Sequence, residues 1–243
     1  MQNKYTNAYG GINLSDEKVK EQEKEDKLEN IKELGASDLP KPDDKVQVIP
    51  IIGQIEGHNL ASPQTKSTKY EHIIPQLISI ERDENVEGIL IVLNTVGGDV
   101  EAGLAIAEMI NSVSKPTVSL VIGGGHSIGV PLATAANYSF ISPTATMIVH
   151  PIRMTGLVIG VPQTFEYFNK MQKRIIEFVT RTSKITEEHF RELMLQSDEL
   201  LNDMGTILIG KQAVEHGIID EVGGIKEALA KLYKLIEEKK SQP

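Results

Sequence analysis

The sequence lacks cysteine altogether, and its six histidines show no H-x-x-x-H spacing. Without cysteine the chain has no disulfide, no thiol nucleophile and no cysteine-ligated zinc site. An excess of positive charge is also missing, since 25 lysines and arginines face 34 aspartates and glutamates, for a net charge of −9. A general nucleic-acid-binding protein needs a basic surface, so this class is excluded.

Long hydrophobic runs are absent too. No stretch reaches the roughly 18 apolar residues that a membrane-spanning helix needs, although 40% of the residues are hydrophobic, enough for a sizeable core. The first residues, MQNKYTNAYGG, contain no apolar segment of the kind found in secretory signals. We therefore expect no membrane span and a cytoplasmic location.

The chain divides by composition at about residue 44. Residues 1–44 are rich in Glu, Lys and Asp and poor in apolar side chains. Such a segment cannot bury enough surface to offset its conformational entropy, so we expect a disordered, charged N-terminal tail. Residues 45–240 have the length and apolar content of one folded domain.

Strand-like and helix-like segments alternate in this domain. Continuous apolar runs predict buried parallel strands, and apolar residues spaced three and four apart predict helices. The pattern therefore indicates an α/β fold with a mostly parallel sheet. Strands are expected at 46–55, 88–94, 116–122, 145–149 and 218–222, and helices at 73–84, 100–112, 128–136, 164–180, 186–195, 211–216 and 225–239, with a polar loop at 58–67.

Two glycine-rich turns follow predicted strands. The segment Asn94-Thr-Val-Gly-Gly-Asp99 either lets backbone N–H groups approach a ligand or is only a tight turn. The segment Gly123-Gly-Gly-His-Ser-Ile-Gly129 contains G-x-S-x-G. A serine on such a turn projects its hydroxyl, and the next N–H can face an oxyanion, although Ser127 could equally be a helix cap.

His150 directly follows the predicted strand 145–149. A lone histidine in this place is usually a structural residue. Here, however, enough chain separates it from Ser127 for one helix and one strand, a unit that can return the backbone to its starting point. A serine nucleophile needs a neighbouring base, which His150 could supply.

These motifs, in this order, resemble those of the ClpP family of serine peptidases within the crotonase-like superfold. The family pattern N-x-x-G-G, G-x-x-x-S-x-G and M-I-H-x-P corresponds to Asn94–Gly98, Gly123–Gly129 and Met147–Pro151. The segment 213–220, AVEHGIID, is similar to the family's A-V-E-Y-G-L-I-D, so the likeness covers about residues 46–235. It is greatest for a branch from spore-forming bacteria linked to protein export.

The resemblance implies a fold of stacked ββα units with a long helix between rings. It also implies Ser127 as nucleophile, His150 as general base, and the backbone N–H groups of Gly98 and Ile128 as the oxyanion hole. The acid of the triad is expected at Asp203, with Asp198 or no acid as the alternatives. No metal or organic cofactor is needed.

Three departures from the family pattern stand near these residues. His126 replaces a small residue before the serine; its side chain could reach substrate or point into solvent, and we expect the second. Ile128 replaces the usual methionine but keeps the N–H donor. Pro151 follows His150 directly, where the family often has glutamine, so the loop 153–162 should differ where substrate binds or rings meet.

The function implied is cleavage of peptides or unfolded protein, including cleaved signal peptides, by a homo-oligomeric ring, with an ATPase partner left open. Three alternatives remain. The first is an α/β-hydrolase using Ser127, Asp203 and His216, which the late position of His216 on a helix end disfavours. The others are a crotonase-type acyl-CoA hydratase or isomerase, and a catalytically impaired ring scaffold.

Overall fold

A computed structural model describes residues 45–59, 61–153, 160–197 and 204–241. The predicted N-terminal tail, residues 1–44, lies outside the described residues, as does most of the loop that follows His150. The described helices and strands run from Val46 to Lys240.

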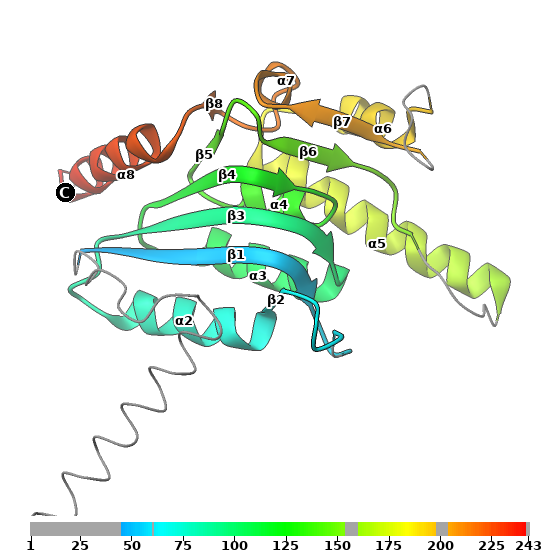
Figure 1. Cartoon of the computed structure of the whole chain (residues 1–243), viewed down its shortest axis with the longest axis horizontal. Helices are drawn as coiled ribbons and strands as arrows, with labels where there is room; N and C mark the ends of the chain where they lie inside the picture. The colour runs from blue at the N-terminus through cyan, green and yellow to red at the C-terminus, as the bar shows by residue number, and fades with distance from the viewer. Residues whose placement is uncertain (1–44, 60, 154–159, 198–203, 242–243) are drawn as a thin grey trace, which may run out of the picture. The chain divides into compact units, whose positions relative to one another are not determined.

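A parallel sheet forms the centre of the described part (Figure 1). Every neighbouring pair along its path is parallel, as the continuous apolar runs predict. With helices on both faces this is a mixed α/β fold, which confirms the expected class. The order across the sheet is β2 (Ser67–Lys69), β1 (Val46–Glu56), β3 (Gly88–Gly98), β4 (Thr117–Gly125), β5 (Tyr138–Ile141) and β8 (Glu221–Val222).

Two further strands leave this path. β6 (Thr146–Val149) pairs with β4 at one position, where Thr146 lies opposite Gly124. Its other edge pairs with β7 (Thr206–Ile209) in antiparallel orientation, with Val149 opposite Thr206. β6 therefore joins the end of the central sheet to a small outer ribbon.

The two faces of the sheet are covered unequally. The larger core packs α2 (Tyr70–Arg82), α3 (Val100–Ser112) and α4 (Gly129–Thr134) against one face, and α6 (Glu187–Leu195) and α7 (Lys211–Glu215) contribute to it. The smaller core holds α8 (Ile225–Lys240) against Leu90, Val118 and Leu120 on the other face.

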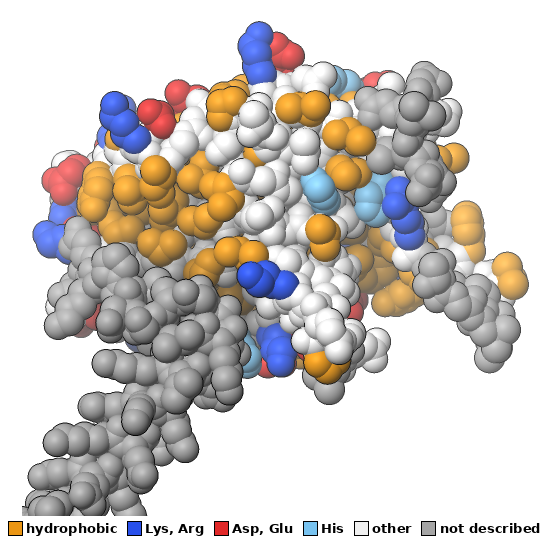
Figure 2. All heavy atoms as spheres, viewed as in Figure 1, with side chains coloured by type: hydrophobic (Ala, Val, Ile, Leu, Met, Phe, Trp, Pro, Cys, Tyr) orange, Lys and Arg blue, Asp and Glu red, His pale blue; other side chains and the backbone are white. Residues whose placement is uncertain are grey.

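Beyond α8, the second face of the sheet keeps apolar side chains at the surface. Val48 on β1 and Ile122 on β4 are 49% and 44% exposed, and Val92 on β3 is partly buried beside them. Figure 2 shows hydrophobic side chains gathered over this end of the sheet next to α8. We call Val48, Val92 and Ile122 the open sheet face.

The longest helix, α5 (Val161–Thr182), has two different halves. From Met171 onward it buries Ile175, Ile176, Phe178 and Val179 in the core. Val161 and Phe165 in its first half are each 67% exposed. None of the described helices is long and apolar enough to span a bilayer.

Two ion pairs tie the buried half of α5 to α3. Both amino groups of the Arg174 guanidinium donate to the Glu101 carboxylate, at 2.7 and 3.0 Å. Two helical turns further along both helices, Arg181 donates to both carboxylate oxygens of Glu108 at 2.8 Å. The two partners on each helix are seven residues apart, so the pairs lie along one side of the helix contact.

Several elements match their sequence prediction closely. α3 covers the predicted range, and the Thr186 hydroxyl caps α6 by accepting a hydrogen bond from the His189 N–H. The sequence pattern does not predict three short strands: β2, whose first residue Ser67 falls in the expected loop 58–67, and β5 and β7. All have three or four residues, too few for a clear alternation.

Candidate active site

The end of β3 is shaped by two glycines that no other residue could replace without strain. Gly97 and Gly98 have φ values of +88° and +150°. A Cβ on Gly98 would lie 2.2 Å from the Ile55 carbonyl oxygen, and one on Gly97 would lie 2.6 Å from the Cβ of Ser127. The glycines therefore let β3 end directly against the Ser127 turn.

Ser127 occupies the turn between β4 and α4. It is the one non-glycine among the described residues with positive φ, at +57°. Its N–H donates to the Ile148 carbonyl at 2.8 Å, and its carbonyl accepts from the Val130 N–H at 3.0 Å. A serine held in this conformation between strand and helix is the geometry of a nucleophile elbow.

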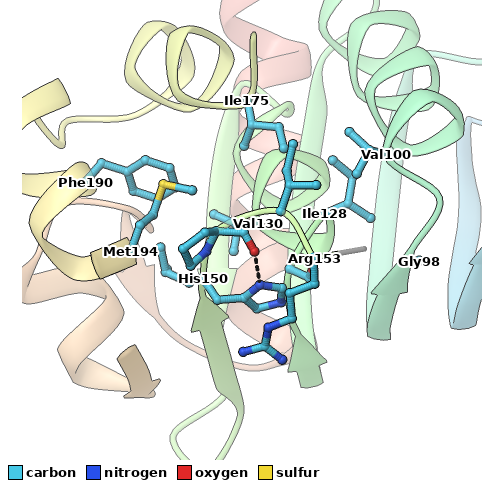
Figure 3. A pocket seen from close by; sticks show the side chains of 13 residues that line it. Gly98, Val100, Ile128, Val130, His150, Arg153, Ile175, Phe190 and Met194 are labelled. Carbon is cyan, nitrogen blue, oxygen red and sulfur yellow. Dashed lines mark hydrogen bonds between the residues drawn. The ribbon is translucent and has the colours of Figure 1, made fainter. Parts of the chain in front are cut away.

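His150 follows the last residue of β6 and is half-buried. Its Nδ1 lies 2.6 Å from the Pro151 carbonyl oxygen, the bond drawn in Figure 3. Because a carbonyl only accepts, Nδ1 must carry the proton in this bond. In a neutral ring Nε2 is then the basic nitrogen.

One cavity of about 180 Å³ is lined by the serine, the histidine and the two residues expected to form the oxyanion hole. Ser127, His150, Gly98 and Ile128 all line it. Figure 3 shows that the wall opposite is apolar and comes from several elements, including the start of α4, α5 and α6. These apolar lining residues include Val100, Val130, Ile175, Phe190 and Met194, and Arg153 is the cationic one.

The structure thus brings together Ser127, His150, Gly98 and Ile128 as the sequence suggests. The sequence does not predict the apolar wall from α5 and α6. Its residues follow ordinary helical spacing, so the sequence carries no signal that separates cavity-lining residues from core residues.

Asp203 and Asp198, the two candidates for the triad acid, lie outside the described residues. The described chain after them comes close to the histidine, because a Cβ on Gly205 would lie 2.8 Å from the Cβ of His150. Gly205 has a φ of +133° and precedes β7, whose first residue pairs with Val149. β7 therefore begins beside His150.

His216, the base in the α/β-hydrolase alternative, does not line the cavity. Its Nδ1 lies 2.7 Å from Nε2 of His189 on α6, and the two rings stack with centroids 5.0 Å apart. The placement of His216 therefore gives no support to that alternative.

The expectation that His126 points into solvent is wrong. The ring is half-buried, and its Nε2 lies 2.8 Å from the Thr146 hydroxyl. Burial, together with the nearby charge of His150, lowers the pKa of His126 below 6.5. The ring can lie there because position 124 is glycine, where a Cβ would be 3.1 Å from Cε1 of His126.

A metal centre has no evident place in the described part of the chain, where no three His, Asp or Glu residues cluster closely enough to hold an ion. Asp99 at the end of β3 has a structural task instead. Its carboxylate accepts from the Ala102 N–H at 2.8 Å and caps α3.

Comparison with known proteins agrees with this geometry. The Clp protease family model matches residues 51–226. The translocation-enhancing protein TepA of Halalkalibacterium halodurans is 60% identical over 217 residues, which cover 89% of this chain and 84% of that protein. The ATP-dependent Clp protease proteolytic subunit of Lactococcus lactis subsp. cremoris is 28% identical over 157 residues, covering 62% and 74%. That of Streptococcus sanguinis is 27% identical over 183 residues, covering 73% and 85%.

Proposed function

Because this chain belongs to the Clp protease family, in the TepA branch, we propose that it is a serine endopeptidase that cleaves peptides or unfolded protein. The observation that carries the proposal is the shared cavity. A serine in a strained turn and a histidine whose Nδ1 lies 2.6 Å from the Pro151 carbonyl oxygen both line it, beside an apolar wall.

In the proposed mechanism the Ser127 hydroxyl attacks the scissile carbonyl while Nε2 of His150 accepts its proton. The carbonyl carbon becomes tetrahedral, and its oxyanion accepts hydrogen bonds from the N–H groups of Gly98 and Ile128. His150 then donates the proton to the leaving amine. Water, activated by the same imidazole, hydrolyses the acyl-enzyme and restores the serine. The residues require no cofactor for these steps.

Asp203 is the proposed acid that orients His150. Support comes from its place in the chain, two residues before Gly205, which lies against His150. Two residues of extended chain span about 7 Å at most, so a carboxylate at position 203 is within reach of the imidazole. Its carboxylate would accept the Nδ1–H in place of the Pro151 carbonyl and so hold the same tautomer.

The substrate follows from the cavity wall. Val130, Ile175, Phe190 and Met194 offer an apolar surface for a side chain next to the scissile bond. Signal peptides cleaved during export are rich in such residues, and the relative's name links it to translocation. We therefore propose apolar peptides in the cytoplasm as the substrate class, and leave an ATPase partner open.

We also propose that the protein works as a homo-oligomeric ring. The open sheet face and the exposed first half of α5 both present apolar side chains that a second copy could cover. Light scattering at micromolar concentration should give a multiple of the 26.7 kDa subunit mass. A value near one subunit would contradict the ring.

A fluorophosphonate probe tests the catalytic proposal directly, because it labels only an activated serine. The wild-type protein should be labelled and Ser127→Ala should not. Ser112→Ala removes an exposed hydroxyl that bonds the Met109 carbonyl and is the matched control, which should label normally. Absence of labelling in the wild-type protein would favour the impaired ring scaffold.

A further inference from the structure

His126 joins two parts of the site that the chain itself leaves loosely connected. The residue stands directly before Ser127, on the turn between β4 and α4. Its ring lies over the Gly124 backbone, and Nε2 reaches the hydroxyl of Thr146 at 2.8 Å. Thr146 is the first residue of β6, the strand that leads to His150.

Few backbone contacts hold β6 to the serine side. Among the described residues, β4 and β6 pair only where Gly124 faces Thr146. One more hydrogen bond, from the Ser127 N–H to the Ile148 carbonyl, follows at 2.8 Å. The His126–Thr146 bond adds a hydrogen bond between side chains to these two backbone contacts and to the packing of Met147 and Val149 in the core.

The chemistry of His126 and Thr146 allows their hydrogen bond to persist at neutral pH. Burial and the charge of His150 lower the pKa of His126, so the ring is neutral at neutral pH. A neutral imidazole nitrogen and a hydroxyl can bond in either direction. Apart from His150, the charged group lining the cavity in the described part of the chain is Arg153.

We propose that His126 is a positioning residue, whose hydrogen bond to Thr146 fixes the Ser127 turn against the strand that delivers His150. This inference rests on the proposed function of Ser127 and His150. Glycine at position 124 leaves room for the ring in this position, since a Cβ there would lie 3.2 Å from Nε2 of His126, closer than an ordinary contact. A displacement of about 1 Å between reacting groups can cost a hundredfold in rate.

Peptide turnover in matched variants tests the proposal. His126→Ala and Thr146→Val should each lower kcat about 10- to 100-fold with KM nearly unchanged, because alignment is lost and binding is kept. The double variant should be no slower than either single variant, since both remove the same bond. Thr146→Ser keeps the hydroxyl and should restore turnover.

Exposed residues supply the controls. His72→Ala and Thr65→Val change side chains at the surface, far along the chain from the cavity residues, and should leave kcat unchanged. A fully additive double variant, or a Thr146→Ser protein as slow as Thr146→Val, would overturn the positioning role. So would variants whose kcat equals that of the wild-type protein.

A measurement without turnover separates this proposal from the proposed function. In proton NMR the His126 ring should titrate below 6.5 in Ser127→Ala protein, and its pKa should rise when His150→Gln removes the neighbouring charge. A His126 pKa insensitive to both His150→Gln and Thr146→Val would refute the link. A wild-type serine that reacts with no fluorophosphonate would instead refute the peptidase.

Discussion

The strands that lead to Ser127 and to His150 are held in very different ways. β4, which ends at the serine turn, pairs with β3 over Thr117–Val121 and again at Gly125, and with β5 over Val118–Val121. β6, which ends just before the histidine, pairs with β4 at one position and with the short antiparallel β7 over its whole length. Figure 1 shows β4 inside the sheet and β6 beside β7.

This difference separates two tasks within one site. The serine side is fixed by glycine contacts and by the central sheet, so its strained backbone is strongly determined. The histidine side depends on a four-residue strand and on contacts made by individual groups. Changes on the serine side should therefore affect stability, and changes on the histidine side should affect alignment.

The largest expected effect comes from removing the two reacting groups. Ser127→Ala and His150→Ala should each lower peptide turnover by about 10⁴- to 10⁶-fold, and the double variant should be no worse, since the groups act as a unit. Steady-state hydrolysis of an apolar fluorogenic peptide measures this. Either variant with near-normal turnover would remove that residue from the mechanism.

The next largest loss of turnover is expected from substituting the proposed triad acid, on the histidine side. Asp203→Asn should keep the fold and lower turnover by about 10⁴-fold, because the imidazole loses its orienting charge. Asp198→Asn is the matched control and should remain within a few-fold of the wild-type rate. A small effect at Asp203 would mean that the Pro151 carbonyl alone orients His150.

Alanine substitutions at two glycines allow a direct comparison of the serine side and the histidine side. Gly98→Ala places a Cβ 2.2 Å from the Ile55 carbonyl inside the central sheet, and Gly205→Ala places one 2.5 Å from the Val149 carbonyl at the outer ribbon. Gly98→Ala should cost about 3 kcal/mol of unfolding free energy or more, and Gly205→Ala about 1–2 kcal/mol, because the outer ribbon can shift.

Urea unfolding and turnover, measured on the same two proteins, decide this prediction. Gly205→Ala should also reduce kcat, since its new Cβ would lie 2.8 Å from the Cβ of His150. Equal stability losses in the two variants would mean that the ribbon is as firmly held as the sheet.

The smallest expected effect is a pH dependence of stability. The pKa of His126 is lower in the folded protein than its ordinary value of 6.5, mainly because of burial. The unfolded chain therefore takes up this proton first as the pH falls, so the stabilisation present above pH 6.5 is lost on acidification.

Denaturant unfolding from pH 7 to about pH 5 tests this sign against the His126→Gln variant. The wild-type protein should lose more unfolding free energy over this range than the variant does. Identical pH profiles would show that the ring is as accessible to protons in the folded state as in the unfolded one.

Sequence alone predicted the parts of the molecule that local patterns determine. The periodicity of residues 100–112 gives α3, and the turn chemistry around Ser127 gives the elbow. His126 could not be placed, because its burial depends on Thr146, which the single β4–β6 contact brings beside it. The apolar cavity wall was missed for the same reason, since α5 and α6 meet the site only through the tertiary fold.

The helix α5 is held to the rest of the domain mainly through its second half. Its first half, residues 161–170, is about 15 Å long, and its second half is tied to α3 by the Arg174–Glu101 and Arg181–Glu108 pairs. A force on the exposed first half is resisted in the second half by the two exposed ion pairs and by the buried residues beneath them. The ion pairs weaken as the salt concentration rises. Because Ile175 is buried in this second half and also lines the cavity, a force on the exposed half of α5 would be felt at the cavity wall.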